Sequence, residues 1–153
     1  MPHLLIVAHC PSENAAAMGD AVLRGSRSDV VEGVTVERRA PLETGPEAVL
    51  KADGMILGTT ENFGYMSGAL KDFFDRIYYP CLEQTQGLPY AMFIKAGNDG
   101  TGAMSSIRRI VSGLSWREVQ APVLCVGKPD GSLLEECENL GLTLAAGLEA
   151  GVF

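Results

Sequence analysis

Apolar runs recur along the chain at intervals that suit buried strands. Continuous apolar runs lie at residues 4–8, 55–57 and 90–94, and such runs are typical of parallel strands covered on both faces. Residues 34–38 alternate between apolar and polar side chains, which predicts an edge strand with one exposed face. A fifth strand is expected within residues 119–126.

Helical spacing of apolar residues separates these strands. The clearest pattern follows Ser67, where apolar positions obey the i, i+3, i+4, i+7 rule as far as Ile77, and Pro80 is expected to end the helix. Gly25 stands where a left-handed C-cap of the first helix should fall, and Pro46 suits the first position of a short helix. Three more helical patterns lie at residues 17–22, 107–114 and 133–148.

Five strands that alternate with helices over short connections predict a doubly wound parallel sheet with right-handed crossovers, which is an α/β fold. The 153 residues match the size of one ordinary domain, so residues 1–153 are expected to form a single domain. No internal repeat or low-complexity segment interrupts the pattern.

Composition narrows the classes of partner. A net charge of −7 argues against nucleic acids and anionic membranes, and favours a small molecule or a protein. The four cysteines lack the CxxC spacing of a zinc site and are interpreted as cytosolic thiols. No apolar run is long enough to span a bilayer and no leader pattern is present, so we expect a soluble cytoplasmic protein without a metal site.

Three loops should meet at the carboxyl edge of such a sheet, where ligands of doubly wound folds bind. They are residues 9–15, 59–67 and 96–103, and the second and third are rich in glycine and small polar residues. Backbone amides in these loops can come within hydrogen-bonding reach of a flat polar ligand. The alternative for the third loop is a plain strand-to-helix turn, and a dinucleotide motif is disfavoured because the glycines follow the fourth strand.

Residues 58–76, with the sequence GTTENFGYMSGALKDFFDR, carry a specific resemblance. This stretch resembles the flavodoxin-like FMN proteins, and within them the NAD(P)H-dependent quinone and FMN reductases. The likeness extends from Leu4 to about Val126. It implies a flavodoxin-like five-stranded sheet in the order 2-1-3-4-5, with FMN as the cofactor.

The same resemblance implies that the first loop wraps the FMN phosphate, in the family form Ser-x-Ser/Thr-Gly-Asn-Thr. Here Cys10 replaces the first Ser, Ser12 keeps the second hydroxyl, Glu13 replaces Gly, Asn14 matches, and Ala15 replaces Thr. Loss of one hydroxyl bond to a charged phosphate costs roughly 1.5 to 3 kcal/mol, or about ten- to a hundredfold in affinity. We therefore expect FMN binding that is weakened but not abolished.

The resemblance and the loop positions together give sixteen candidate cofactor-binding residues, and no side chain is singled out as a catalytic acid or base. The candidates are His9, Cys10, Ser12, Asn14, Ala15, Thr59, Thr60, Glu61, Asn62, Phe63, Gly64, Tyr65, Gly97, Asn98, Asp99 and Gly100. For Phe63 and Tyr65 the alternative is ordinary packing against the sheet.

Other polar and aromatic pairs are expected to be structural. Arg108 and Arg109 are interpreted as a solvated helix face, with recognition of an NADPH phosphate as the alternative. Tyr78 and Tyr79 are interpreted as packing at a helix end or as a contact between subunits.

Three functions fit these observations. The first is an oxidoreductase in which NADH or NADPH reduces FMN and a quinone or similar small acceptor reoxidises it in a two-electron reaction. The second is a flavodoxin that carries single electrons, although carriers in the family commonly cover both flavin faces with aromatic residues and the third loop has none. The third is an FMN-free binding or regulatory module. Family members are often homodimers or homotetramers.

Overall fold

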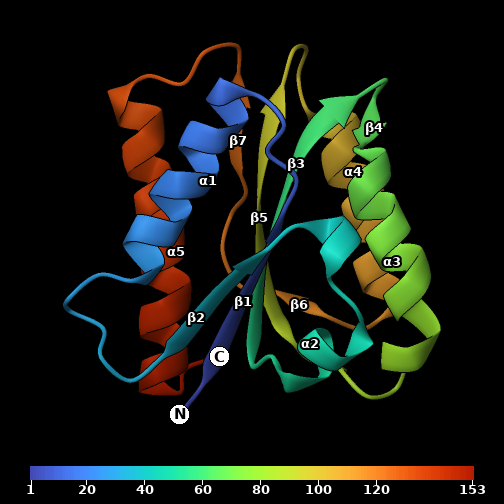
Figure 1. The fold of residues 1–153 in the computed structure, drawn as a ribbon, viewed down its shortest axis with the longest axis vertical. Helices are drawn as coiled ribbons and strands as arrows, with labels where there is room; N and C mark the ends of the chain where they lie inside the picture. Colours follow the sequence, from blue (N-terminus) through green and yellow to red (C-terminus); the bar gives the residue numbers. More distant parts are fainter.

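A computed structural model describes all of residues 1–153 as alternating strands and helices (Figure 1). The strands are β1 (His3–Ala8), β2 (Thr35–Arg39), β3 (Gly54–Asn62), β4 (Tyr65–Met66), β5 (Pro89–Ala96), β6 (Arg117–Glu118) and β7 (Val123–Val126). The helices are α1 (Glu13–Ser26), the short 3₁₀ helix η1 (Pro41–Glu43), α2 (Pro46–Lys51), α3 (Gly68–Cys81), α4 (Thr101–Gly113) and α5 (Gly131–Ala150). No helix is long and apolar enough to cross a membrane.

The sheet has the order β2-β1-β3-β5, and both β6 and β7 pair with the outer side of β5. All of these pairs are parallel, whereas β4 is antiparallel to β3. With β6 and β7 taken as one interrupted strand, this is the predicted order 2-1-3-4-5, so the predicted fold class is confirmed. The fifth strand was expected within residues 119–126, where β7 lies, and the structure adds the two-residue β6 just before that range.

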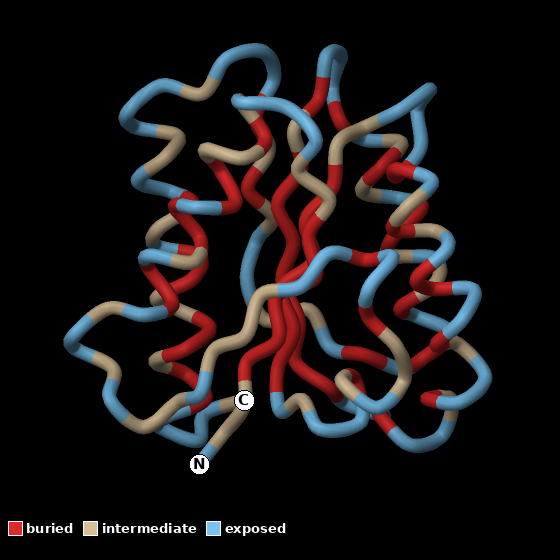
Figure 2. Tube along the Cα trace, viewed as in Figure 1, coloured by how far each residue is buried: buried red, intermediate tan, exposed pale blue.

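Helices cover both faces of the sheet (Figure 1). One core lies between the sheet and α2, α3 and α4, and contains large side chains such as Phe73, Phe74 and Trp116. The other lies beneath α1 and α5, around Phe93 and Leu144. Figure 2 shows the buried strands running between the two helical layers, while the connecting segments at the ends of the strands are largely exposed. This arrangement leaves the loops at the carboxyl edge available to a ligand.

The two helices of the second face pack unusually closely because glycines lie at their crossing. A Cβ atom at Gly25 would overlap the carbonyl oxygen of Glu138 on α5, and one at Gly141 would overlap that of Val22 on α1. Gly25 is therefore inside α1 and not its C-cap, which is Arg27. The prediction of a C-cap at Gly25 was wrong, because glycine serves close helix packing as well as a left-handed turn.

Two other local predictions differ from the structure. Helix α3 passes through Pro80 and ends one residue later, since proline removes one helical hydrogen bond while its fixed φ suits a helix. Residues 59–67, expected as a loop, continue β3 to Asn62 and then form a hairpin with β4. The second loop of the site is consequently a structured strand pair.

Candidate functional site

The parallel register brings the three predicted loops to one edge of the sheet. Ala8 is paired with Gly58, and the amide of His9 donates a hydrogen bond to the Gly58 carbonyl at 3.0 Å. Thr60 on β3 is paired with Lys95 on β5, directly before the glycine-rich loop. The edge lies at the top of Figure 1, where α1 and α4 begin.

The first loop ends in an N-cap that leaves amides available. Ser12 Oγ accepts the amide of Ala15 at 3.2 Å, and the Ser12 carbonyl accepts that of Ala16 at 2.8 Å. The amides of Glu13 and Asn14 have no such partner, and they lie at the N-terminus of a helix, which attracts anions. Thus Ser12 acts as the helix cap, and these two amides are the donors that an anion can use.

His9 and Cys10 lie on the β2 side of this loop. They line a hollow of about 410 Å³ together with Arg38 and Arg39. Burial raises the pKa of the Cys10 thiol, and the adjacent Arg38 guanidinium lowers that pKa by a smaller amount. Arg38 is itself paired with Asp20 at 2.8 Å. Because the thiol remains protonated at neutral pH, Cys10 is not an activated nucleophile.

The β3–β4 hairpin presents an aromatic residue in a strained conformation. Its two-residue turn has Phe63 at φ 54° and Gly64 at φ 70°, which is the pattern of a type I′ turn. The Phe63 side chain is fully exposed, at 107%, and Tyr65 is 40% exposed. The alternative of ordinary packing is therefore wrong for Phe63. A large aromatic residue with positive φ and no packing partner is unfavourable for the fold alone, which points to a role in binding.

Glu61 ties this hairpin to the third loop and to α4. Its carboxylate accepts the amide of Gly100 at 3.2 Å and that of Ala103 at 3.1 Å. A Cβ atom at Gly102 would overlap the Gly64 carbonyl oxygen, so glycine is required for this close approach. The Gly100 amide is therefore already hydrogen-bonded to Glu61, and Glu61 holds the hairpin against the third loop.

The third loop is small, polar and open. Residues 97–99 are exposed, and Gly100 has a left-handed φ of 75°. Asp99 Oδ1 accepts the amide of Thr101 at 3.0 Å and its hydroxyl at 2.9 Å, and these bonds lower the pKa of Asp99. Asp99 thus fixes the turn that leads into α4, whose N-cap is Gly100, and the loop has no aromatic side chain.

The threonines that follow Gly58 have different partners. Thr59 lies on the α3 and α4 side of the sheet, where its Oγ1 accepts the Ser67 amide at 2.9 Å and donates to the Thr60 carbonyl at 2.8 Å. Thr60 lies on the opposite side, and its Oγ1 is the one buried side-chain N or O atom that lacks a hydrogen-bond partner. Buried polar groups are nearly always paired, so this oxygen suits a polar ligand.

These observations fit FMN. The free amides of Glu13 and Asn14 and the unpaired hydroxyl of Thr60 are suitable partners for a phosphate and a polyol chain. The exposed Phe63 and Tyr65 offer aromatic surface on the hairpin, next to the small residues of the third loop. Asn62 and Asn98 are exposed, and their side chains make no hydrogen bond within the protein.

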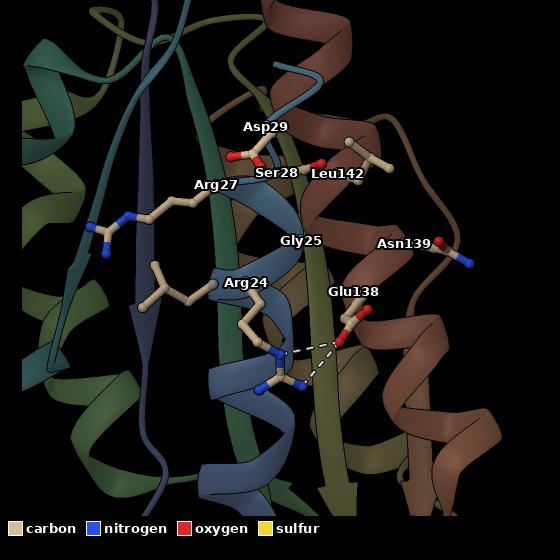
Figure 3. A pocket seen from close by; sticks show the side chains of 9 residues that line it. Arg24, Gly25, Arg27, Ser28, Asp29, Glu138, Asn139 and Leu142 are labelled. Carbon is tan, nitrogen blue, oxygen red and sulfur yellow. Dashed lines mark hydrogen bonds and ion pairs between the residues drawn. The ribbon is translucent and has the colours of Figure 1, made fainter. Parts of the chain in front are cut away.

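A larger hollow, of about 630 Å³, lies elsewhere, beside the C-terminal half of α1 and the middle of α5. Figure 3 shows Arg24 and Glu138 pointing toward each other from these two helices, with two hydrogen bonds of 3.1 Å. Since α1 runs back from the carboxyl edge, this hollow is at the end of α1 remote from the three loops. This hollow is remote from the three loops, so it is not the candidate site.

Two polar residues outside the predicted set lie near the edge. Ser106 accepts the Met66 amide at 3.1 Å, which fixes β4 on α4. Lys95 is partly buried on β5, and its signal in the sequence is a single charge in an otherwise apolar run.

Arg108, expected on a solvated face, instead donates two hydrogen bonds of 2.9 Å to Glu118, whereas Arg109 is exposed. The structure therefore gives Arg108 a local partner.

Comparison with known proteins agrees with this geometry. The family model described as NADPH-dependent FMN reductase matches residues 28–130. A flavodoxin of Aquifex aeolicus is 30% identical over 102 residues, which cover 67% of this chain and 54% of that protein. The chain thus spans about half the length of this curated relative.

Solved structures show the same fold at lower identity. A flavodoxin from the domain Archaea has a TM-score of 0.80 and 21% identity, over 95% of this chain and 98% of that one. Two-electron reduced flavodoxin of Megasphaera elsdenii has a TM-score of 0.77 and 18% identity, over 94% and 98%. Because the family match covers most of the chain, including the second and third loops, the chain belongs to the NADPH-dependent FMN reductase family and has a flavodoxin-like fold.

Proposed function

We propose that the chain binds FMN at its carboxyl edge and is an oxidoreductase that takes electrons from NADH or NADPH and passes them to a quinone or similar small acceptor. The observation that carries the proposal is the asymmetry of the edge. Phe63 is fully exposed on the hairpin, and the exposed residues 97–99 of the neighbouring third loop are small and non-aromatic. A flavin between them would keep one face accessible to a nicotinamide and then to an acceptor.

FMN would supply the hydride chemistry, and the protein would position the reactants. Glu13 and Asn14 would offer amides to the phosphate, while Phe63 and Tyr65 would contact the ring system. Glu61 would hold the hairpin and the third loop at a constant separation through its bonds to Gly100 and Ala103. No acid or base is required by this scheme.

The test is anaerobic stopped-flow mixing of the FMN-loaded protein with NADPH and, separately, with NADH. We expect loss of the oxidised flavin absorbance on mixing with at least one nicotinamide, followed by its recovery when a small quinone is added. Absence of reduction by both nicotinamides would refute the enzyme proposal.

A one-electron carrier is the second candidate, and it is favoured by the similarity to flavodoxins over nearly the whole chain. It predicts slow reduction by nicotinamides and fast electron exchange with a redox protein.

An FMN-free module is the third candidate, and it is favoured by Glu13 and Ala15, which depart from the phosphate-loop pattern. A flavin fluorescence titration that shows no saturable binding would select this third candidate. A homodimer or homotetramer remains a prediction for size-exclusion chromatography with light scattering.

A further inference from the structure

Lys95 is located on the same face of the sheet as the N-terminus of α1. Along β5 the side chains of Ala91 and Phe93 belong to the core beneath α1 and α5, and Lys95 continues this alternation. Its register neighbours are Thr60 on β3 and Cys125 on β7. The row therefore places an ammonium group one strand away from the unpaired Thr60 hydroxyl.

This ammonium group has no acidic partner. Lys95 Nζ donates to the Ala96 carbonyl at 3.3 Å, and none of the ion pairs of the protein includes it. In a chain with a net charge of −7, a partly buried lysine without a carboxylate is a local excess of positive charge. Such a charge is well suited to an anionic ligand.

The strand that leads into α1 and the strand that carries Lys95 flank β3 on its two sides. Helix α1 begins directly after β1 at the carboxyl edge and contacts both β3 and β5. Neighbouring strands are about 4.7 to 4.9 Å apart, so the flexible four-carbon side chain of Lys95 can reach from β5 to the position of Thr60 on β3. An anion bound at the Thr60 hydroxyl would therefore have the ammonium group of Lys95 on one side and the free amides at the start of α1 on the other.

We propose that Lys95 is the positive charge that binds the phosphate monoester of FMN, and that it lets the site distinguish FMN from riboflavin. This proposal rests on the proposed function and deepens it. It also accounts for the altered first loop, in which the acidic Glu13 lies in the first turn of α1 and Ala15 has no hydroxyl. A lysine from another strand offsets both changes by a direct charge interaction with the dianion.

The test compares FMN with riboflavin, which differ by the phosphate alone. Dissociation constants are measured by flavin fluorescence titration for the wild type, Lys95→Gln, Lys95→Arg and Lys51→Gln. Lys51 is an exposed lysine at the end of α2, so it is the matched control. We expect Lys95→Gln to weaken FMN by about ten- to a hundredfold and to leave riboflavin within about twofold. Lys95→Arg should retain most of the preference for FMN, and Lys51→Gln should equal the wild type.

Salt and competition supply independent readouts. The FMN preference of the wild type should fall as the salt concentration rises, whereas that of Lys95→Gln should stay low throughout. Inorganic phosphate should compete with FMN more effectively in the wild type than in Lys95→Gln. Thermal unfolding of each variant checks that its fold is intact.

The outcomes separate the two proposals. If wild-type protein binds neither flavin, both proposals fail. If it binds FMN and Lys95→Gln binds FMN equally well, or loses FMN and riboflavin to the same extent, the role of Lys95 is refuted while the flavin site stands. Equal affinity of the wild type for FMN and riboflavin would likewise refute this role alone.

Discussion

Replacing Phe63 by asparagine should make the protein more stable and its flavin site weaker. Phe63 occupies the first central position of a type I′ turn with φ 54°, and Gly64 follows it. A residue with a Cβ atom pays about 1 to 2 kcal/mol in the left-handed region, whereas asparagine tolerates it and Asn-Gly is the preferred pair for this turn. Since the phenyl ring is fully exposed, its removal costs no packing.

The net gain in unfolding free energy should be about 1 kcal/mol, which corresponds to a rise in Tm of roughly 2 to 4 °C for a domain of this size. Aromatic contacts contribute about 0.5 to 1.5 kcal/mol beyond the area that they bury, so FMN affinity should fall by about tenfold. Differential scanning calorimetry of the apoprotein and flavin fluorescence titration measure the two effects.

Phe63→Tyr is the control, because it keeps both the aromatic ring and the backbone strain, and it should change neither quantity by much. A loss of stability in Phe63→Asn would show that the ring has a packing role in the fold. Unchanged FMN affinity would show that the ring does not contact the flavin. Either result would refute the reasoning that connects the strained turn to binding.

The remaining predictions concern the hydrogen bonds of Glu61, the close contact between Gly102 and Gly64, and the buried cysteine thiols. Glu61→Gln should lower the unfolding free energy by about 2 kcal/mol, because an amide oxygen replaces a carboxylate that accepts two N–H groups. Calorimetry tests this, with Glu135→Gln at an exposed position as the control. Equal Tm values for the two variants would contradict the prediction. Gly102→Ala should lower the unfolding free energy by about 1 to 3 kcal/mol and weaken FMN binding, because the added methyl group displaces the hairpin at Gly64. A wild-type Tm together with a wild-type dissociation constant for FMN would exclude this contact. Burial raises the pKa of Cys81 to about 11 and that of Cys137 to about 12, so neither should be alkylated in the native protein at neutral pH, while both should react in denaturant. Mass spectrometry after iodoacetamide treatment measures this, and rapid native labelling at Cys81 or Cys137 would count against it.

Sequence patterns predict the parts of this fold that depend on neighbouring residues. The apolar run at residues 4–8 and the helical spacing after Ser67 reflect burial repeated along one element, so they are visible in the chain itself. The sequence did not predict the hairpin after Thr60, because Glu61 and Asn62 are polar, β4 has only two residues, and Phe63 stands in the turn where asparagine or glycine is the usual signal.

Contacts between distant residues could not be predicted in the same way. Glu61 has the right position for a flavin loop, but its actual partners lie 39 and 42 residues further along the chain. Gly25 has the same local appearance whether it ends a helix or meets the backbone of α5. Residue type and spacing predict the edge at which the loops meet, and the tertiary structure decides which groups there remain free.

The close glycine contact between α1 and α5 affects the order in which the site can form during synthesis. Helix α1 carries the free amides of the first loop, yet the helix that packs against its backbone spans Gly131–Ala150. The hairpin and α4, which complete the other side, are translated well before that helix. On the ribosome, the half proposed to contact the flavin ring can therefore assemble first, and the half proposed to bind the phosphate has to wait for α5 before its geometry is final. A nascent chain that stops short of α5 should accordingly bind flavin poorly, even though every predicted contact residue has already been made.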